Sequence, residues 1–137
     1  MRKFLPYVLV AVLLPAFPSV SYPSELSHFK ELGKLGEERN KPKLWESARL
    51  FFKKYPRSDR VPDVRLMLAD AEDEPDRAVS LYRVLTDKYR YYPRRDYAFC
   101  RICEINYLRS RWQDVVKDAA EAERAFPRSP YLYSMRR

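Results

Sequence analysis

A chain of 137 residues has room for a single domain, and its composition excludes several classes of protein. Two glycines stand against eleven prolines, which favours helices that end at prolines over a sheet with glycine turns. Seven Phe, eleven Tyr and two Trp supply enough apolar surface for a core, so an intrinsically disordered chain is excluded. The formal net charge of +8 favours an acidic partner or surface.

The first 21 residues have the pattern of a secretory signal. Arg2 and Lys3 precede an apolar run over residues 4–17, and Ser19 and Ser21 are small residues before a cut after Ser21. The run is short for a bilayer and contains two prolines, so the pattern favours a cleaved signal over an uncleaved anchor. We therefore predict an exported bacterial protein, located in the periplasm or at the periphery of the outer membrane.

Beyond the signal, apolar residues recur every three or four positions, which is the spacing of one face of a helix. These apolar stripes cover residues 26–35, 45–55, 64–71, 78–89, 97–108 and 112–126, and a last one begins at 131. The segment 96–110 is apolar on nearly every side, so we expect this helix between neighbours rather than at the rim. Asp96 is its predicted N-cap. No segment alternates long enough for a strand, which predicts an all-α fold.

An aromatic-Pro-Arg motif occurs three times, as Tyr55-Pro56-Arg57, Tyr92-Pro93-Arg94 and Phe126-Pro127-Arg128. Two helices and a short turn fit between successive motifs, at a period near the ~34 residues of the tetratricopeptide repeat (TPR). Neither helix of such a unit can bury its apolar face alone, so the units must stack. We predict about six helices in stacked antiparallel hairpins. Residues 22–43 would form an N-terminal helix and loop, and residues 44–137 the repeat domain.

Residues 44–137 resemble the TPR proteins of the bacterial envelope. The stretch FFKKYPRSD, followed by LADA and AVSLYRVLTDKY, is similar to outer-membrane assembly lipoproteins and to periplasmic proteins that work with the Tol-Pal system. The resemblance implies a scaffold that binds another envelope protein or a peptide in a groove lined by the first helices of the units. The residues on the repeat's aromatic, leucine and small-residue positions are Phe99, Ile102, Cys103, Trp112, Ala119 and Ala122.

Two sets of residues are candidates for contact with a partner. The resemblance implies that Arg65, Arg101 and Arg109 face the groove. Aromatic and basic residues interleave most densely in the stretch KYRYYPRR, and Tyr and Arg are common at binding hot spots. In the alternative reading, Tyr89 and Tyr92 pack at the junction of two units and the arginines are only solvated. The candidates in this stretch are Arg90, Tyr91, Arg94 and Arg95.

Cys100 and Cys103 have the C-x-x-C spacing of redox and metal sites. Thioredoxin-like chemistry needs this pair at a helix N-terminus after a strand, whereas here it lies inside a predicted helix. A zinc site needs two further ligands, and the only histidine, His28, is distant in sequence. The pattern favours two buried thiols. A disulfide between the two cysteines, and a redox protein that uses them, stay open because exported proteins meet an oxidising compartment.

No set of catalytic residues is assembled in the sequence. The carboxylates of residues 70–76 bracket an expected turn, where they stabilise the start of the next helix. Calcium and phosphate loops need glycines that the chain lacks. We therefore predict a protein that is not an enzyme and that carries no cofactor or metal.

Charge, export and the last apolar stripe each bear on the identity of the partner. Outside the cytosol, a basic surface fits an anionic membrane or an acidic envelope polymer, and this is the alternative function. Export argues against nucleic acid, so we predict none. The apolar stripe that begins at Tyr131 docks back on the last hairpin, leaves an open end that a homodimer would cover, or continues in a longer natural chain.

Overall fold

The computed structural model describes residues 23–135, and within that range it contains seven helices and no strand. The all-α prediction is therefore confirmed. The predicted signal over residues 1–21 lies outside the described residues. The helices are α1 (Glu25–Glu37), α2 (Lys41–Lys54), α3 (Val61–Asp70), α4 (Pro75–Lys88), α5 (Arg95–Leu108), α6 (Trp112–Ala125) and α7 (Leu132–Met135).

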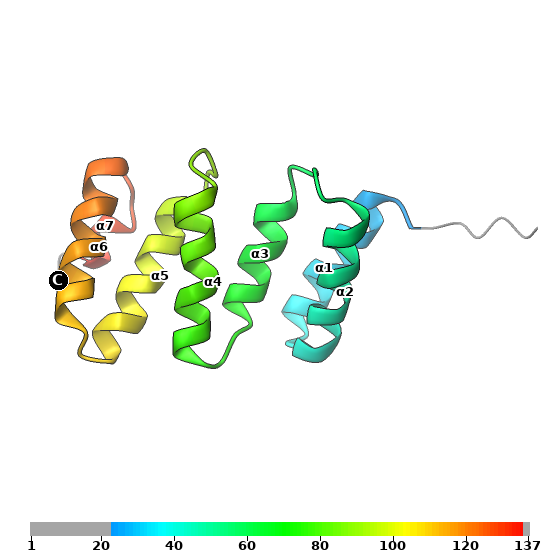
Figure 1. The fold of residues 1–137 in the computed structure, drawn as a ribbon, viewed down its shortest axis with the longest axis horizontal. Helices are drawn as coiled ribbons and strands as arrows, with labels where there is room; N and C mark the ends of the chain where they lie inside the picture. Colours follow the sequence, from blue (N-terminus) through cyan, green and yellow to red (C-terminus); the bar gives the residue numbers. More distant parts are fainter. Residues whose placement is uncertain (1–22, 136–137) are drawn as a thin grey trace, which may run out of the picture.

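Consecutive helices form three antiparallel hairpins that stand in a row, and the short α7 packs against α5 and α6 (Figure 1). The turns within the hairpins, residues 38–40, 71–74 and 109–111, lie at one edge, which we call the turn edge. The connections between hairpins, residues 55–60, 89–94 and 126–131, lie at the opposite edge, which we call the loop edge. Because α1 packs against α2 and α3, the boundary predicted after residue 43 does not separate two packing units.

Side chains close several helix N-termini at positions that the sequence marks. Ser24 accepts a hydrogen bond from the amide of Ser27, and the Glu74 carboxylate accepts from the amides of Asp76 and Arg77. The N-cap predicted at Asp96 is wrong. Helix α5 begins one residue earlier, at Arg95, so this carboxylate lies in the first turn and is free to bond elsewhere.

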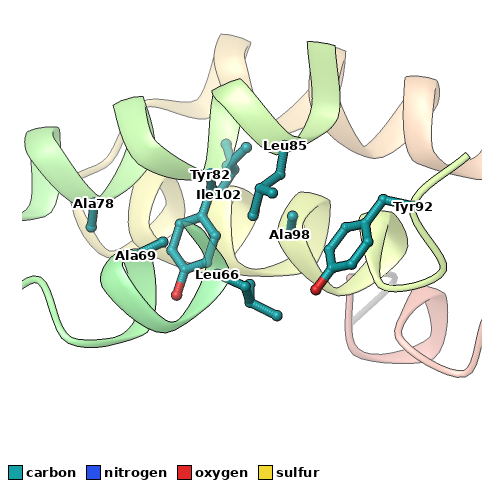
Figure 2. Close-up of a cluster of buried hydrophobic side chains, with 8 residues drawn as sticks. All are labelled: Leu66, Ala69, Ala78, Tyr82, Leu85, Tyr92, Ala98 and Ile102. Atoms are coloured by element: carbon teal, nitrogen blue, oxygen red, sulfur yellow. The ribbon is translucent and has the colours of Figure 1, made fainter. Parts of the chain in front are cut away.

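Three clusters of buried side chains form the core, and α3 and α5 each contribute to two of them. From α3, Leu66 joins the cluster shared with α4 and α5, whereas Val64 joins the cluster shared with α1 and α2. From α5, Ile102 faces α3 and α4, whereas Phe99 packs with α6 and α7. The prediction that this helix lies between neighbours is thus confirmed. Figure 2 shows the central cluster: Leu66, Ala69, Ala78, Tyr82, Leu85, Tyr92, Ala98 and Ile102.

Two of the three aromatic-Pro-Arg motifs are followed by a serine that ties the loop to the start of a preceding helix. The Ser58 hydroxyl donates to Glu25 at the start of α1 over 2.6 Å, and the Ser129 hydroxyl donates to Asp96 at the start of α5 over 2.6 Å. Both bonds join residues that are 33 positions apart. The motif therefore ends one hairpin and also fixes the next connection onto it.

The middle motif has Arg95 where the other two have serine. There the Tyr92 hydroxyl donates to Asp63 on α3 over 2.7 Å, so a hydroxyl–carboxylate bond is kept with a different donor. The Arg95 guanidinium turns inward, donates to the carbonyl of Thr86 over 2.7 Å and lies over the ring of Phe99. Arg95, a predicted contact residue, is thus held by packing and hydrogen bonding within the fold.

Ion pairs join neighbouring turns along the turn edge. Lys41 donates to Glu72 over 2.6 Å and lies 3.4 Å from Asp73, which links the first turn to the second. Arg111 lies 2.6 Å from Asp76, which links the third turn to the start of α4. The Glu72 side chain is buried, so its carboxylate depends on its two ion-pair partners, Lys41 and Arg77.

The Glu72 pairing predicts an acid-sensitive contribution to stability. The hydrogen bond from Lys41 holds the pKa of Glu72 below its usual range. Burial opposes this lowering of the pKa, and the amide of Glu74 and the charge of Arg77 add to it. A carboxyl group whose pKa is lowered by folding stabilises the protein at pH values above its unfolded-state pKa. That stability is lost as the pH falls through the folded-state pKa. We expect Glu72→Gln to lower the free energy of unfolding by about 2 kcal/mol near neutral pH. The difference in unfolding free energy between Glu72→Gln and the parent should shrink below roughly pH 4.

Chemical denaturation near neutral pH and again below roughly pH 4 measures this difference in unfolding free energy. The matched control is Glu46→Gln, because Glu46 is exposed on α2 and makes no ion pair among the described residues. The control should match the parent at both pH values. A Glu72→Gln deficit of the same size in acid would show that the charge of Glu72 is not responsible.

Candidate functional site

Two cavities open on the side of the stack formed by the first helices of the hairpins. One, of about 640 Å³, lies between α1 and α3. The other, of about 210 Å³, lies where α3 and α4 meet the end of α5. Asp70 and Asp73 line both, so the two cavities adjoin at the C-terminal end of α3. We call the two cavities together the groove.

The only two glycines of the chain, Gly33 and Gly36, lie within α1 and line the larger cavity. Neither has a positive φ, and a Cβ at either position would meet no atom within 4 Å. Glycine in a helix costs roughly 0.5–1 kcal/mol relative to alanine. Backbone conformation and internal packing therefore do not account for these glycines. Because these two glycines have no side chain, the backbone of α1 itself forms this part of the cavity wall.

Asp70 stands where the two cavities adjoin and is held by tyrosines. Its carboxylate accepts from the Tyr82 hydroxyl over 2.6 Å and from the Tyr97 hydroxyl over 3.2 Å. Burial and the bond to Asp70 together raise the pKa of Tyr82, so this hydroxyl remains a donor at physiological pH. No Lys or Arg lies within ion-pair distance of Asp70 in the described part of the chain. The groove thus presents a fixed carboxylate that forms no ion pair among the described residues.

The groove arginines predicted from the resemblance fall in two places. Arg101 and Arg109 line the smaller cavity, where Arg101 pairs with Glu104 on the same helix. Arg65 lines neither cavity. Its Nε donates to the Tyr89 hydroxyl over 3.0 Å and its guanidinium lies over Phe52, so it packs between α2 and the end of α4.

The contact residues predicted in KYRYYPRR lie at the loop edge, away from the groove. Arg90 and Tyr91 line a shallow cavity of about 360 Å³ there, and the Tyr91 side chain is 98% exposed. Arg94 is exposed and lies over the ring of Tyr97. The structure therefore separates the two predicted sets of residues into two surfaces.

Sequence reasoning missed the glycine pair and Asp70. The glycines left a usable signal, because two glycines inside a helical stripe of a chain with no others need an explanation. Asp70 left none. Its role depends on hydroxyls of Tyr82 and Tyr97, which belong to two other helices and reach it only in the folded stack.

Both cysteines are buried in the middle of α5, and no disulfide joins them. The Cys100 thiol donates to Glu104 over 3.6 Å. Burial, with smaller effects from nearby acidic groups, raises the pKa of Cys103 to about 12. A thiol with a raised pKa is a poor nucleophile, so this environment does not favour the redox hypothesis.

The C-terminal end of the stack is covered in part by α7. Leu132 is buried against Phe99 and Ala122, so the last stripe docks back on the final hairpin. Trp112 and Val116 on α6 remain exposed, at 53% and 69%. The homodimer stays a prediction.

Comparison of the chain with protein-family models, with curated proteins and with solved structures found no match. The resemblance to envelope TPR proteins therefore stays a prediction. Within residues 23–135 no helix is long and apolar enough to cross a membrane. The same residues contain no cluster of His, Cys, Asp and Glu side chains that could hold a metal ion.

Proposed function

We propose that the protein is an exported scaffold that binds an amphipathic helix of another protein in the groove. The observation that carries the proposal is the pair Gly33 and Gly36. They weaken α1, leave open space where a Cβ would lie and line a cavity of about 640 Å³. Glycines at such a position allow the backbone of a ligand to come close. A helix that lies in a groove is a common mode of peptide recognition.

The lining of the groove defines the chemistry of this helix. Met67 lines the larger cavity and Ile105 and Leu108 line the smaller one, which suits apolar side chains on one face of the ligand. Asp70 lies between them with both hydroxyl donors in place and forms no ion pair among the described residues, which suits a Lys or Arg of the ligand. The expected ligand therefore has a small or apolar face and a basic residue near its centre.

Replacing Gly33 by a residue with a larger side chain tests the proposal. Helical peptides displayed on phage are selected against the parent protein, and their affinities are then measured by fluorescence anisotropy. Gly33→Leu places a side chain in the cavity, so we expect the affinity to fall at least about tenfold. Because a Cβ here meets nothing, Gly33→Ala should raise the free energy of unfolding by about 0.5–1 kcal/mol.

The matched control is Lys43→Leu, an exposed position of α2 that lines neither cavity. It should bind the selected peptides as the parent does. Peptides that bind the parent and Gly33→Leu equally well would overturn the proposal, provided that Gly33→Leu unfolds at the parent's denaturant concentration.

A further inference from the structure

The two edges of the stack carry opposite charge. When two residues on each side of every connection are included, the loop edge has ten basic and three acidic residues. The turn edge, counted in the same way, has four basic and seven acidic residues. The ion pairs between neighbouring turns neutralise much of the turn edge. The positive excess of the described chain is therefore concentrated at the loop edge.

Few of the loop-edge cations have partners within the protein. Arg60 pairs with Glu25, and Arg95 is turned inward. The acids Asp59 and Asp87 are exposed at this edge but form no ion pair among the described residues. Five cations, spread over all three connections, make no hydrogen bond or ion pair in the described part of the chain: Lys53, Arg57, Lys88, Arg90 and Arg128.

We propose that the loop edge binds the surface of a bilayer that contains anionic lipids. The three connections lie along one side of the row of hairpins, so a flat surface can meet all of them at once (Figure 1). Tyr91, the most exposed aromatic residue of the chain's described part, stands in the middle connection between Arg90 and Tyr92. Tyrosines are enriched at the membrane–water interface, and juxtamembrane cations are attracted by anionic head groups.

The start of the described chain favours a lipid surface over other polyanions. The carbonyl of Pro23 accepts from the Tyr55 hydroxyl over 3.0 Å and from Lys54 over 3.3 Å, which places it at the loop edge. The described chain thus begins at this edge, and in the sequence the apolar run over residues 4–17 precedes it. If the run stays attached to the chain, its insertion in lipid brings the loop edge to the bilayer.

The loop edge is separate from the groove, because the cations of the loop edge line neither groove cavity. The two tryptophans offer an internal reference for an experiment. Trp45 follows the first turn and Trp112 begins α6, so both lie toward the turn edge. An indole introduced by Tyr91→Trp would lie at the loop edge. Fluorescence can therefore report which edge of the full chain meets lipid.

The test measures quenching of indole fluorescence by a nitroxide-headgroup lipid, in phosphatidylcholine vesicles with or without phosphatidylglycerol. In the full chain with Tyr91→Trp, we expect added quenching in phosphatidylglycerol vesicles, whereas Trp45 and Trp112 of the parent are unaffected. Each cation at an anionic surface contributes about fivefold in affinity. Loss of three cations alone corresponds to roughly a hundredfold, and the triple variant Arg57→Glu, Arg90→Glu and Arg128→Glu also adds three negative charges. It should therefore need at least roughly a hundredfold more anionic lipid for half-maximal quenching.

A second triple variant controls for net charge: Lys30→Glu, Lys43→Glu and Arg49→Glu. These three cations are exposed on α1 and α2 and make no ion pair among the described residues. The control should stay within about threefold of the parent, because charges away from the contact are screened. Equal losses in the two triples, or no quenching of the new indole, would overturn the proposal. So would a short DNA duplex that binds the loop edge more tightly than the vesicles do, because it would assign the edge to nucleic acid.

Discussion

Arg83→Met is expected to lower the free energy of unfolding by about 3 to 5 kcal/mol. Arg83 on α4 donates to Asp118 on α6 over 2.6 Å, and the Asp118 side chain is fully buried. Removal of the guanidinium leaves a buried carboxylate without its cation. The other carboxylate oxygen, Oδ1, already has no hydrogen-bond partner in the described part of the chain. No other Lys or Arg forms an ion pair with Asp118 among the described residues.

The double variant Arg83→Met with Asp118→Leu shows whether the unpaired charge is the cause. Apolar residues of similar volume often replace a buried pair with little loss, so the double variant should recover most of the deficit. Urea denaturation of the parent, both single variants and the double variant gives the coupling energy. A single Arg83→Met variant within about 1 kcal/mol of the parent would show that the pair is not stabilised as described.

Phe51→Ala is expected to cost a similar 3 to 5 kcal/mol, but with its effect concentrated in one hairpin. Phe51 is fully buried in the cluster of α1, α2 and α3, 5.4 Å from the His28 ring and 5.1 Å from the Tyr55 ring. In a row of hairpins each unit is stabilised by itself and by its neighbours. We therefore expect faster amide hydrogen exchange in α1 and α2, with α5 and α6 close to the parent.

Phe99→Ala is the counterpart at the other end of the row. Phe99 is fully buried against Ala122 and Leu132, so its truncation should speed exchange in α6 and α7 and leave α1 and α2 protected. Equal acceleration in all helices for both variants would mean that the stack unfolds only as a whole.

Much of the fold could be predicted because its signals are local. The prolines at 56, 93 and 127 follow helix ends, and the helix over 95–108 is apolar on both sides that pack. The first hairpin was harder to predict, because no aromatic-Pro-Arg motif precedes α1. Its turn also lacks glycine: Arg39 has a φ of 54°, and Ser110 in the third turn has a φ of 58°. Non-glycine residues seldom take this conformation, so composition gives no sign of such turns.

The site could be predicted only in part, because sequence spacing does not show which face of a helix meets solvent. Arg65 and Asp70 are five positions apart on α3 and so point in different directions. The arginine packs between α2 and α4, and the carboxylate lies in the groove. The periodicity predicts the apolar face of α3, and only the packing of its neighbours decides which polar face stays open.

Hydroxyl–carboxylate bonds tie each connection to the first helix of the hairpin that it follows. Ser58 bonds Glu25 at the start of α1, Ser129 bonds Asp96 in the first turn of α5, and Tyr92 bonds Asp63 on α3 in the middle hairpin. Donor and acceptor are thus inherited together. Duplication or deletion of one whole unit would carry this bond with its connection and leave the corresponding bonds of the other units in place, whereas the ion pairs between hairpins would change. The length of such a chain can therefore change by whole hairpins while the chemistry of each connection stays constant.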